Sequence, residues 1–195
     1  VLNKYLQVND VASLIRFAKN KPNELSYASS GIGTSIHLSG ELFAQLTKIK
    51  MKHIPYKGRA QAIPDLLGGR VQMSFDNLTS ALPLIKSGDL IALGVTSSSR
   101  SSYAPDIPTL AESGIAELKH FNITSWFSLM GPAGMNKEDV KKIADETKRI
   151  LQLPEVREKL ISMGLEPNPQ GPQALHKLIT AESKRYSKLI KEIGI

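Results

Sequence analysis

The chain has no cysteine among its 195 residues, which excludes disulfides and thiol chemistry. It has one tryptophan, and aromatic residues make up only 6% of the sequence. No apolar run reaches the ~18–20 residues that a membrane-spanning helix needs. The four histidines stand apart, with no His-x-x-x-His pair, so the sequence predicts no metal site. We also expect no cofactor.

The balance of charge is basic but gives little support for nucleic-acid binding. The formal net charge is +7, with 41% hydrophobic and 22% charged residues, as in ordinary soluble globular proteins. The basic residues are scattered, and the densest ones lie on expected helices beside Glu and Asp. That pattern indicates solvated helix faces rather than a phosphate-binding stripe. We therefore expect no nucleic-acid partner, and a general attraction for anionic solutes.

Strand-like and helical patterns alternate over the first half of the chain, which predicts an α/β fold with a mostly parallel sheet and helices on both faces. The apolar run Leu90–Thr96 is typical of a strand covered on both sides. Asp10 is placed to cap the first helix. The expected strands are 1–8, 25–29, 51–56, 71–75 and 90–96, and the expected helices are 10–20, 35–49, 60–67 and 79–86.

Beyond Ser97 the composition changes. A Ser- and Pro-rich loop leads to a short helix over 108–113, and 121–130 is an extended apolar stretch that holds Trp126. Asn136 is placed to cap a helix, Pro154 starts another that ends at Gly164, and the last helix begins at Pro172. The roughly 75 residues from 121 onward are too few to make a stable second domain alone, so we interpret them as part of one.

The most informative segment is the turn between the strand at 25–29 and the following amphipathic helix. Two glycines lie among four hydroxyl side chains at a helix N-terminus, where unpaired amides and the helix dipole favour a carboxylate or phosphate. An ordinary N-capped strand-to-helix turn is the alternative. The candidate binding residues of this turn are Ser29, Ser30, Gly31, Gly33, Thr34 and Ser35.

Two further polar segments follow expected parallel strands, whose carboxyl ends share one edge of the sheet. Tyr56 is expected to wall a pocket, Gly58 to let the backbone approach a solute, and Lys57 to act mainly by long-range attraction. Asp76, followed by Asn77, has three possible roles: accepting from a ligand donor, fixing the neighbouring amides, or capping the next helix. We include all five in the candidate site.

The motifs of common enzymes are absent. Ser35, His53 and Asp76 can be written as a triad, but any chain with several Ser, His and Asp permits that. Gly31-Ile32-Gly33-Thr34-Ser35 is not a nucleophile elbow, and it lacks the rest of a dinucleotide-binding fingerprint. His37 is expected to be a satisfied core or supporting group. The sequence therefore predicts a binding protein with no catalytic residues.

Several short motifs occur together in a defined order along the whole chain. In this order and composition they resemble the Bug family, the substrate-binding proteins of tripartite tricarboxylate transporters. The motifs are Ser29-Ser30-Gly31-Ile32-Gly33-Thr34-Ser35-Ile36-His37-Leu38, His53-Ile54-Pro55-Tyr56-Lys57-Gly58, Asp65-Leu66-Leu67-Gly68-Gly69, Phe75-Asp76-Asn77, Ala92-Leu93-Gly94-Val95-Thr96, Pro105-Asp106-Ile107-Pro108-Thr109 and Gly131-Pro132-Ala133-Gly134.

The resemblance implies a periplasmic-binding-protein type II-like fold and a periplasmic location. Family members have two domains that close on a small carboxylate and deliver it to an integral membrane permease. By this resemblance, 9–118 are one complete ligand-binding domain, 1–8 and 119–130 are inter-domain crossing strands, and 131–195 are the C-terminal part of the other domain. Nothing here matches the family's N-terminal part, which supplies a Pro-Gly-Gly loop to the carboxylate site.

The expected function is capture of a di- or tricarboxylate or related organic acid by a monomeric solute-binding protein. Two alternatives remain at this point. An effector-sensing domain of a transcriptional regulator would share the general fold, and a DNA-binding element elsewhere in the protein would favour it. A hydrolase is the weaker alternative, which turnover of simple esters, lost in Ser35→Ala, would support.

Overall fold

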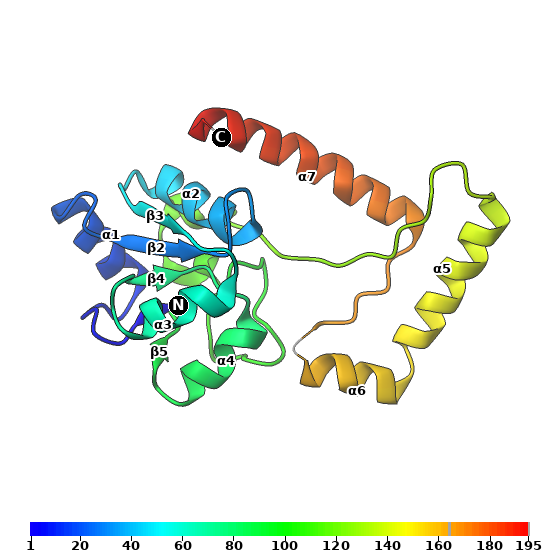
Figure 1. Ribbon diagram of the computed structural model, residues 1–195, viewed down its shortest axis with the longest axis horizontal. Helices are drawn as coiled ribbons and strands as arrows, with labels where there is room; N and C mark the ends of the chain where they lie inside the picture. Colours follow the sequence, from blue (N-terminus) through cyan, green and yellow to red (C-terminus); the bar gives the residue numbers. More distant parts are fainter. Residues whose placement is uncertain (164, 195) are drawn as a thin grey trace. The chain divides into compact units, whose positions relative to one another are not determined.

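The computed structural model describes residues 1–163 and 165–194, which form two compact units, Val1–Ser125 and Trp126–Gly194 (Figure 1). Gly164, the predicted end of a helix, and Ile195, the end of the predicted 131–195 segment, lie outside the described residues. No helix in the described part of the chain combines the length and the apolar character that crossing a membrane requires.

Unit 1 contains a five-stranded sheet whose middle strand is β4 (Met73–Ser74), with β2 (Ser26–Ser29) beside it. β2 pairs in parallel with β3 on one side and with β4 on the other, whereas β1 is antiparallel to both β4 and β5. The sheet is therefore mixed, with two parallel and two antiparallel pairings, although four of its five strands, all but β1, run in one direction as the prediction of a mostly parallel sheet requires. In spatial order the strands are β3 (Lys52–Pro55), β2 (Ser26–Ser29), β4 (Met73–Ser74), β1 (Leu2–Asn3) and β5 (Leu90–Ile91).

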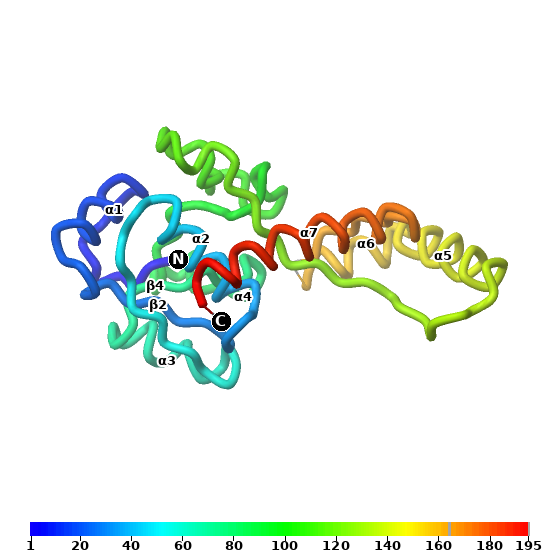
Figure 2. Tube along the Cα trace, turned by 90° about the horizontal axis from the view of Figure 1, so that it is seen from above, coloured from blue at the N-terminus to red at the C-terminus, as the bar shows by residue number. Residues whose placement is uncertain are grey.

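Helices cover both faces of this sheet, as predicted. The chain moves outward from β2 to β3 through α2 and then back across β2 to β4 through α3, so right-handed crossovers place these helices on opposite faces. Figure 2 shows α2 and α3 on opposite sides of β2. The helices of unit 1 are α1 (Val11–Asn20), α2 (Ser35–Thr47), α3 (Arg59–Leu67) and α4 (Leu78–Lys86), with the short 3₁₀ helices η1 (Leu110–Ser113) and η2 (Ala116–Leu118).

The core of unit 1 follows the predicted patterns. Asp10 caps α1 by accepting the Ser13 N–H at 2.6 Å, and the Ser13 hydroxyl accepts the Asp10 N–H at 3.2 Å, which completes a capping box. All four residues of β2 are buried. The largest fully buried apolar and aromatic side chains are Tyr27, Phe43, Phe121, Leu2, Leu25, Leu66, Leu90, Leu118, Ile123 and Val71.

Several predicted strands are shorter than expected, and one is absent. The run Leu90–Thr96 forms a strand only at Leu90–Ile91, because β1, its neighbour, offers just two residues for pairing. The chain then leaves the sheet, and Val95 bonds Pro108 and Leu110 through the backbone at 2.8 and 2.9 Å. Of residues 1–8 only Leu2–Asn3 are in a strand, and the described residues 121–130 contain none.

Unit 2 consists of three helices: α5 (Lys137–Leu151), α6 (Pro154–Ser162) and α7 (Pro172–Ile193). They confirm the predicted helix starts, and Asn136 caps α5 by accepting the Glu138 N–H at 2.8 Å. No residue of α5 or α6 is buried, although both helices are described in full. The assignment of 1–8, 9–118, 119–130 and 131–195 to domains and crossing segments stays a prediction.

Candidate functional site

Three helices of unit 1 begin at one edge of the sheet (Figure 1). β2, β3 and β4 are parallel, and α2, α3 and α4 follow them directly in the chain. The first turn of each helix therefore lies at the carboxyl edge, with N–H groups that carry partial positive charge. Open parallel sheets bind ligands at this edge, and helix N-termini there suit an anion.

The turn between β2 and α2 is shaped by two glycines and closed by a threonine. Gly31 and Gly33 have φ angles of +139° and +78°, which side-chain-bearing residues rarely adopt. Thr34 is the N-cap of α2, and its Oγ1 accepts the His37 N–H at 3.4 Å and donates to the Gly31 carbonyl at 2.7 Å. The hydroxyl of the predicted candidate Thr34 is thus engaged in hydrogen bonds that hold the turn.

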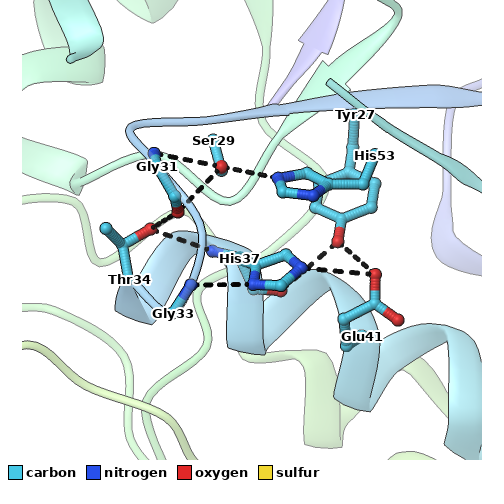
Figure 3. A network of polar contacts seen from close by, with 8 residues as sticks. All are labelled: Tyr27, Ser29, Gly31, Gly33, Thr34, His37, Glu41 and His53. Carbon is cyan, nitrogen blue, oxygen red and sulfur yellow. Dashed lines mark hydrogen bonds and ion pairs between the residues drawn. The ribbon is translucent and has the colours of Figure 1, made fainter. Parts of the chain in front are cut away.

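Two amides of the turn are hydrogen-bonded inside the protein (Figure 3). The Gly31 N–H donates to Ser29 Oγ at 3.2 Å, and the Gly33 N–H donates to His37 Nδ1 at 3.0 Å. Ser29 is itself buried in β2. These groups fix the path of the backbone, so direct ligand contacts from Ser29, Gly31 and Gly33 stay predictions.

Other amides of the same turn are open. In the described part of the chain, the N–H groups of Ile32, Ser35 and Ile36 have no hydrogen-bond acceptor. Ile32 is exposed, and the predicted candidates Ser30 and Ser35 are half-buried. Ser35 and Ile36 form the first turn of α2, where the helix dipole adds to the attraction for an anion. This corner offers the strongest unpaired donors of the turn.

A short chain of polar contacts links two predicted candidates from different helices. Ser35 Oγ and Ser125 Oγ lie 2.9 Å apart, and the Ser125 hydroxyl lies 3.4 Å from Asn77 Oδ1. Asn77 is the N-cap of α4 and makes no capping hydrogen bond with its side chain. The structure thus brings the starts of α2 and α4 together through Ser125.

The Tyr56 side chain is partly buried and bonded to α3. Its ring packs against the buried cluster of Ala28, Ala62 and Val71, and its hydroxyl donates to Asp65 Oδ2 at 2.8 Å. Burial, followed by this bond to Asp65, raises the pKa of the Tyr56 hydroxyl to about 12. The side chain is therefore bonded to α3, and a ligand contact from its ring stays a prediction.

The neighbouring candidates Lys57 and Gly58 form the entry to α3. Lys57 is exposed, and its N–H donates to Gln61 Oε1 at 3.3 Å. Gly58 is the N-cap of α3 with a φ of +147°, and a Cβ atom there would meet nothing within 4 Å. The Gly58 backbone therefore borders open space, which suits the predicted close approach of a solute.

Asp76 is held by an arginine at the start of α3. Arg59 Nε lies 2.9 and 2.7 Å from the two carboxylate oxygens, and Arg59 Nη2 donates to the Ser80 carbonyl at 2.8 Å. The Asp76 side chain is 2% exposed, and its Oδ1 also accepts the Asn77 N–H at 2.9 Å. Of the three expected roles, the structure displays the second, fixing the neighbouring loop, while Asn77 is the N-cap.

An aromatic stack, in which Tyr27 and His37 are buried and His53 is half-buried, lies beside the β2–α2 turn (Figure 3). The His37 and His53 rings are 4.0 Å apart, and Tyr27 stacks on His53 at 4.9 Å. His53 Nε2 lies 2.6 Å from Ser29 Oγ, and the Tyr27 hydroxyl donates to Glu41 Oε1 at 2.5 Å. Burial lowers the pKa of both imidazoles, that of His53 to about 4 with help from His37, so the two rings are neutral at pH 7.

The three side chains considered as a catalytic triad have separate partners. Ser35 contacts Ser125, His53 contacts Ser29, and Asp76 binds Arg59. Within the described residues, no group of three or more His, Asp or Glu is arranged to hold a metal ion. The arrangement offers hydrogen-bond donors to an anion.

Four residues support the site but were not among the predicted binding residues: Arg59, His37, His53 and Ser125. The signal for Arg59 was its place directly after Gly58 in a polar strand end. His37 stood in the same motif as the glycines, and His53 alternates with Pro55 in β3. Ser125 had no signal, because its role depends on a segment without regular structure returning to the sheet edge.

Comparison with known proteins identifies the family. The sequence pattern described as tripartite tricarboxylate transporter family receptor (TctC) matches residues 3–195. Protein BugT of Bordetella pertussis is 34% identical over 194 residues, which cover 100% of this chain and 59% of BugT. The chain therefore spans little more than half the length of this curated relative.

Solved structures agree with the sequence match. R. palustris Rpa4515, solved with adipate, is 35% identical with a TM-score of 0.86 over 100% of this chain and 64% of its own. MatC (Rpa3494) from Rhodopseudomonas palustris, solved with bound malate, is 26% identical with a TM-score of 0.81 over 97% of this chain and 64% of its own. This chain belongs to the TctC family of tripartite tricarboxylate transporter receptors, which includes the Bug proteins.

Proposed function

We propose that this chain is part of a periplasmic solute-binding protein that captures a small organic acid, most simply a dicarboxylate. The observation that carries the proposal is the start of α2 at the carboxyl edge of the sheet, where the N–H groups of Ser35 and Ile36 find no acceptor among the described residues. Adipate in Rpa4515 and malate in MatC support the dicarboxylate class.

The proposed binding chemistry uses fixed dipoles rather than a buried cation. One carboxylate accepts from the Ser35 and Ile36 amides and from the hydroxyl of Ser35, in charge-assisted hydrogen bonds at a helix N-terminus. Arg59 lies at this edge but is bound by the Asp76 carboxylate, so its charge is neutralised within the protein. Selectivity among organic acids then depends on the geometry of these hydrogen-bond donors and on the length of the acid.

In the proposed function, the protein makes and breaks no covalent bond and needs no cofactor. Its family consists of receptors, and we propose that it works as a monomer, closes on its solute and delivers it to an integral membrane permease. In this scheme 9–118 form one lobe and 131–195 contribute to the other. The family match and the relatives described above support neither the transcriptional regulator nor the hydrolase.

Calorimetric titration tests the proposal on the complete protein that contains these 195 residues. We expect adipate or malate to bind and the neutral diamide adipamide to give no heat. Ser35→Ala should weaken binding about tenfold, roughly the 1.4 kcal/mol of one good hydrogen bond. Ser162→Ala, at an exposed position of α6, is the control and should bind as the unaltered protein does. Failure of every mono-, di- and tricarboxylate to bind contradicts the proposal.

A further inference from the structure

The turn that carries the proposed anion site rests on two stacked histidines. His37 is 3% exposed, and its ring lies 4.0 Å from that of His53 with an angle of 20° between the planes. Each ring supports one amide of the turn: His37 accepts from Gly33, and His53 contacts the serine that accepts from Gly31 (Figure 3). Both histidines therefore act on the backbone that shapes the site.

The hydrogen bond from Gly33 fixes the protonation state of His37. A backbone N–H can only donate, so Nδ1 at 3.0 Å has to be the unprotonated acceptor. The proton of the neutral ring then lies on Nε2, which faces Glu41 Oε1 at 3.7 Å. A proton added to Nδ1 would set two donors against each other and remove the only acceptor that Gly33 has among the described residues.

We propose that neutral His37 is a positioning residue for the anion site, holding the turn through the Gly33 N–H, and that protonating it releases the turn and weakens anion binding. The ligand part of this inference rests on the proposed function. The expected change in anion affinity is opposite in sign to the change that simple electrostatics predicts, since an added positive charge near the site would strengthen the binding of an anion. This contrast separates the two explanations.

The groups that face His37 act in opposite directions. Glu41, one turn further along α2, favours the protonated ring, whereas burial disfavours it and is the larger effect, so the pKa of His37 lies below its ordinary value. His53 from β3 opposes a second charge in the stack. Tyr27 from β2 binds the Glu41 carboxylate at 2.5 Å and holds it beside the ring. The pair is thus neutral near pH 7 and accepts protons as the pH falls.

Two substitutions separate the hydrogen bond from packing. His37→Asn places a carbonyl oxygen close to the position of Nδ1, which keeps an acceptor and removes the titration. His37→Phe keeps a flat ring against His53 and removes the acceptor. If the inference is right, the asparagine variant behaves as the unaltered protein does at neutral pH, and the phenylalanine variant does not.

Amide hydrogen exchange gives a readout that needs no ligand. At pH 7 we expect the protection factor of the Gly33 amide to fall about tenfold in His37→Phe and to stay within twofold in His37→Asn. Leu38, whose N–H donates to the Thr34 carbonyl at 2.9 Å, is the internal control for an intact α2. Unchanged Gly33 protection in His37→Phe, with Leu38 also unchanged, overturns the inference.

Adipate titration on the complete protein gives the second readout. Between pH 7.5 and 5.5 we expect adipate affinity to fall more steeply in the unaltered protein than in His37→Asn, which corrects for titration of adipate itself. His37→Phe should bind about tenfold more weakly at pH 7.5. Equal pH dependence in the unaltered protein and His37→Asn overturns the inference. Adipate failing to bind any form contradicts the proposed function instead, and Gly33 exchange still decides the role of His37.

Discussion

Arg59 and Asp76 join the start of α3 to the loop after β4 through one guanidinium nitrogen. Arg59 Nε lies 2.9 and 2.7 Å from the two carboxylate oxygens, and the Asp76 side chain is almost fully buried. Because Asp76 also accepts the Asn77 N–H, the pair holds together two of the three helix starts at the carboxyl edge of the sheet. A carboxylate at a proposed anion site is explained by this internal partner.

Asp76→Asn should therefore act on stability more than on affinity. The substitution leaves the Arg59 guanidinium without its carboxylate, and we expect the free energy of unfolding to fall by about 2 kcal/mol, within the range for a lost bond to a charged group. Urea denaturation measures this change. Asp89→Asn is the matched control, because its pair with Lys4 is exposed on both sides and should contribute clearly less to stability. Equal losses in the two variants would contradict the buried role of Asp76.

Gly40 lets α2 approach β2 closely at the level of the histidine stack. A Cβ atom at this position would lie 2.4 Å from Cε2 of Tyr27, whose ring is fully buried and stacks on His53. We expect Gly40→Ala to lower the free energy of unfolding by about 1–3 kcal/mol, as overpacking does. Gly171→Ala, where a Cβ meets nothing within 4 Å, is the control for thermal denaturation. A neutral Gly40→Ala would mean that α2 shifts without cost.

The histidine stack also predicts how stability depends on pH. Burial holds the pKa of His53 at about 4, against an ordinary value of 6.5, and lowers that of His37 as well. The unfolded chain therefore binds these protons more readily than the folded one, so the free energy of unfolding falls as the pH drops from 6.5 toward 4. Urea midpoints across this window measure the slope.

Two variants test whether the histidine stack causes this pH dependence of stability. His53→Gln should flatten the dependence between pH 6.5 and 4, whatever its effect on stability at neutral pH. His120→Gln removes an exposed histidine and should leave the slope as it was. A slope that survives in His53→Gln would place the responsible protons on other groups.

The sequence predicted features that depend on neighbouring residues and missed those that depend on distant ones. The Asp10 cap, the glycine turn and the starts of α5 and α7 are local, and they were predicted correctly. The extent of Leu90–Thr96 was wrong because a strand needs a partner, and β1 provides only two residues. The length of this strand was therefore decided by strand pairing and not by the β-propensity of its residues.

The same reasoning explains what was found and missed at the candidate site. Polar strand ends predicted which segments share one edge of the sheet, since the edge follows from the order of strands and helices. The bond between Arg59 and Asp76 joins residues 17 positions apart, and no spacing rule indicates it. The direction of the Tyr56 side chain was likewise set by the buried cluster beneath it, which the sequence alone does not locate.

Lys57 tests whether an exposed cation beside the proposed site contributes to binding. Its side chain is exposed, and an exposed ammonium adds mainly long-range attraction that salt screens. Lys57→Met should therefore lower the association rate for adipate at low salt, with little change at high salt and little change in the dissociation rate. Stopped-flow binding to the complete protein at two salt concentrations measures both rates. Lys19→Met, which removes the same charge from the last turn of α1, is the control and should alter neither rate appreciably. A large rise in the dissociation rate of Lys57→Met would show instead that the ammonium contacts the bound acid.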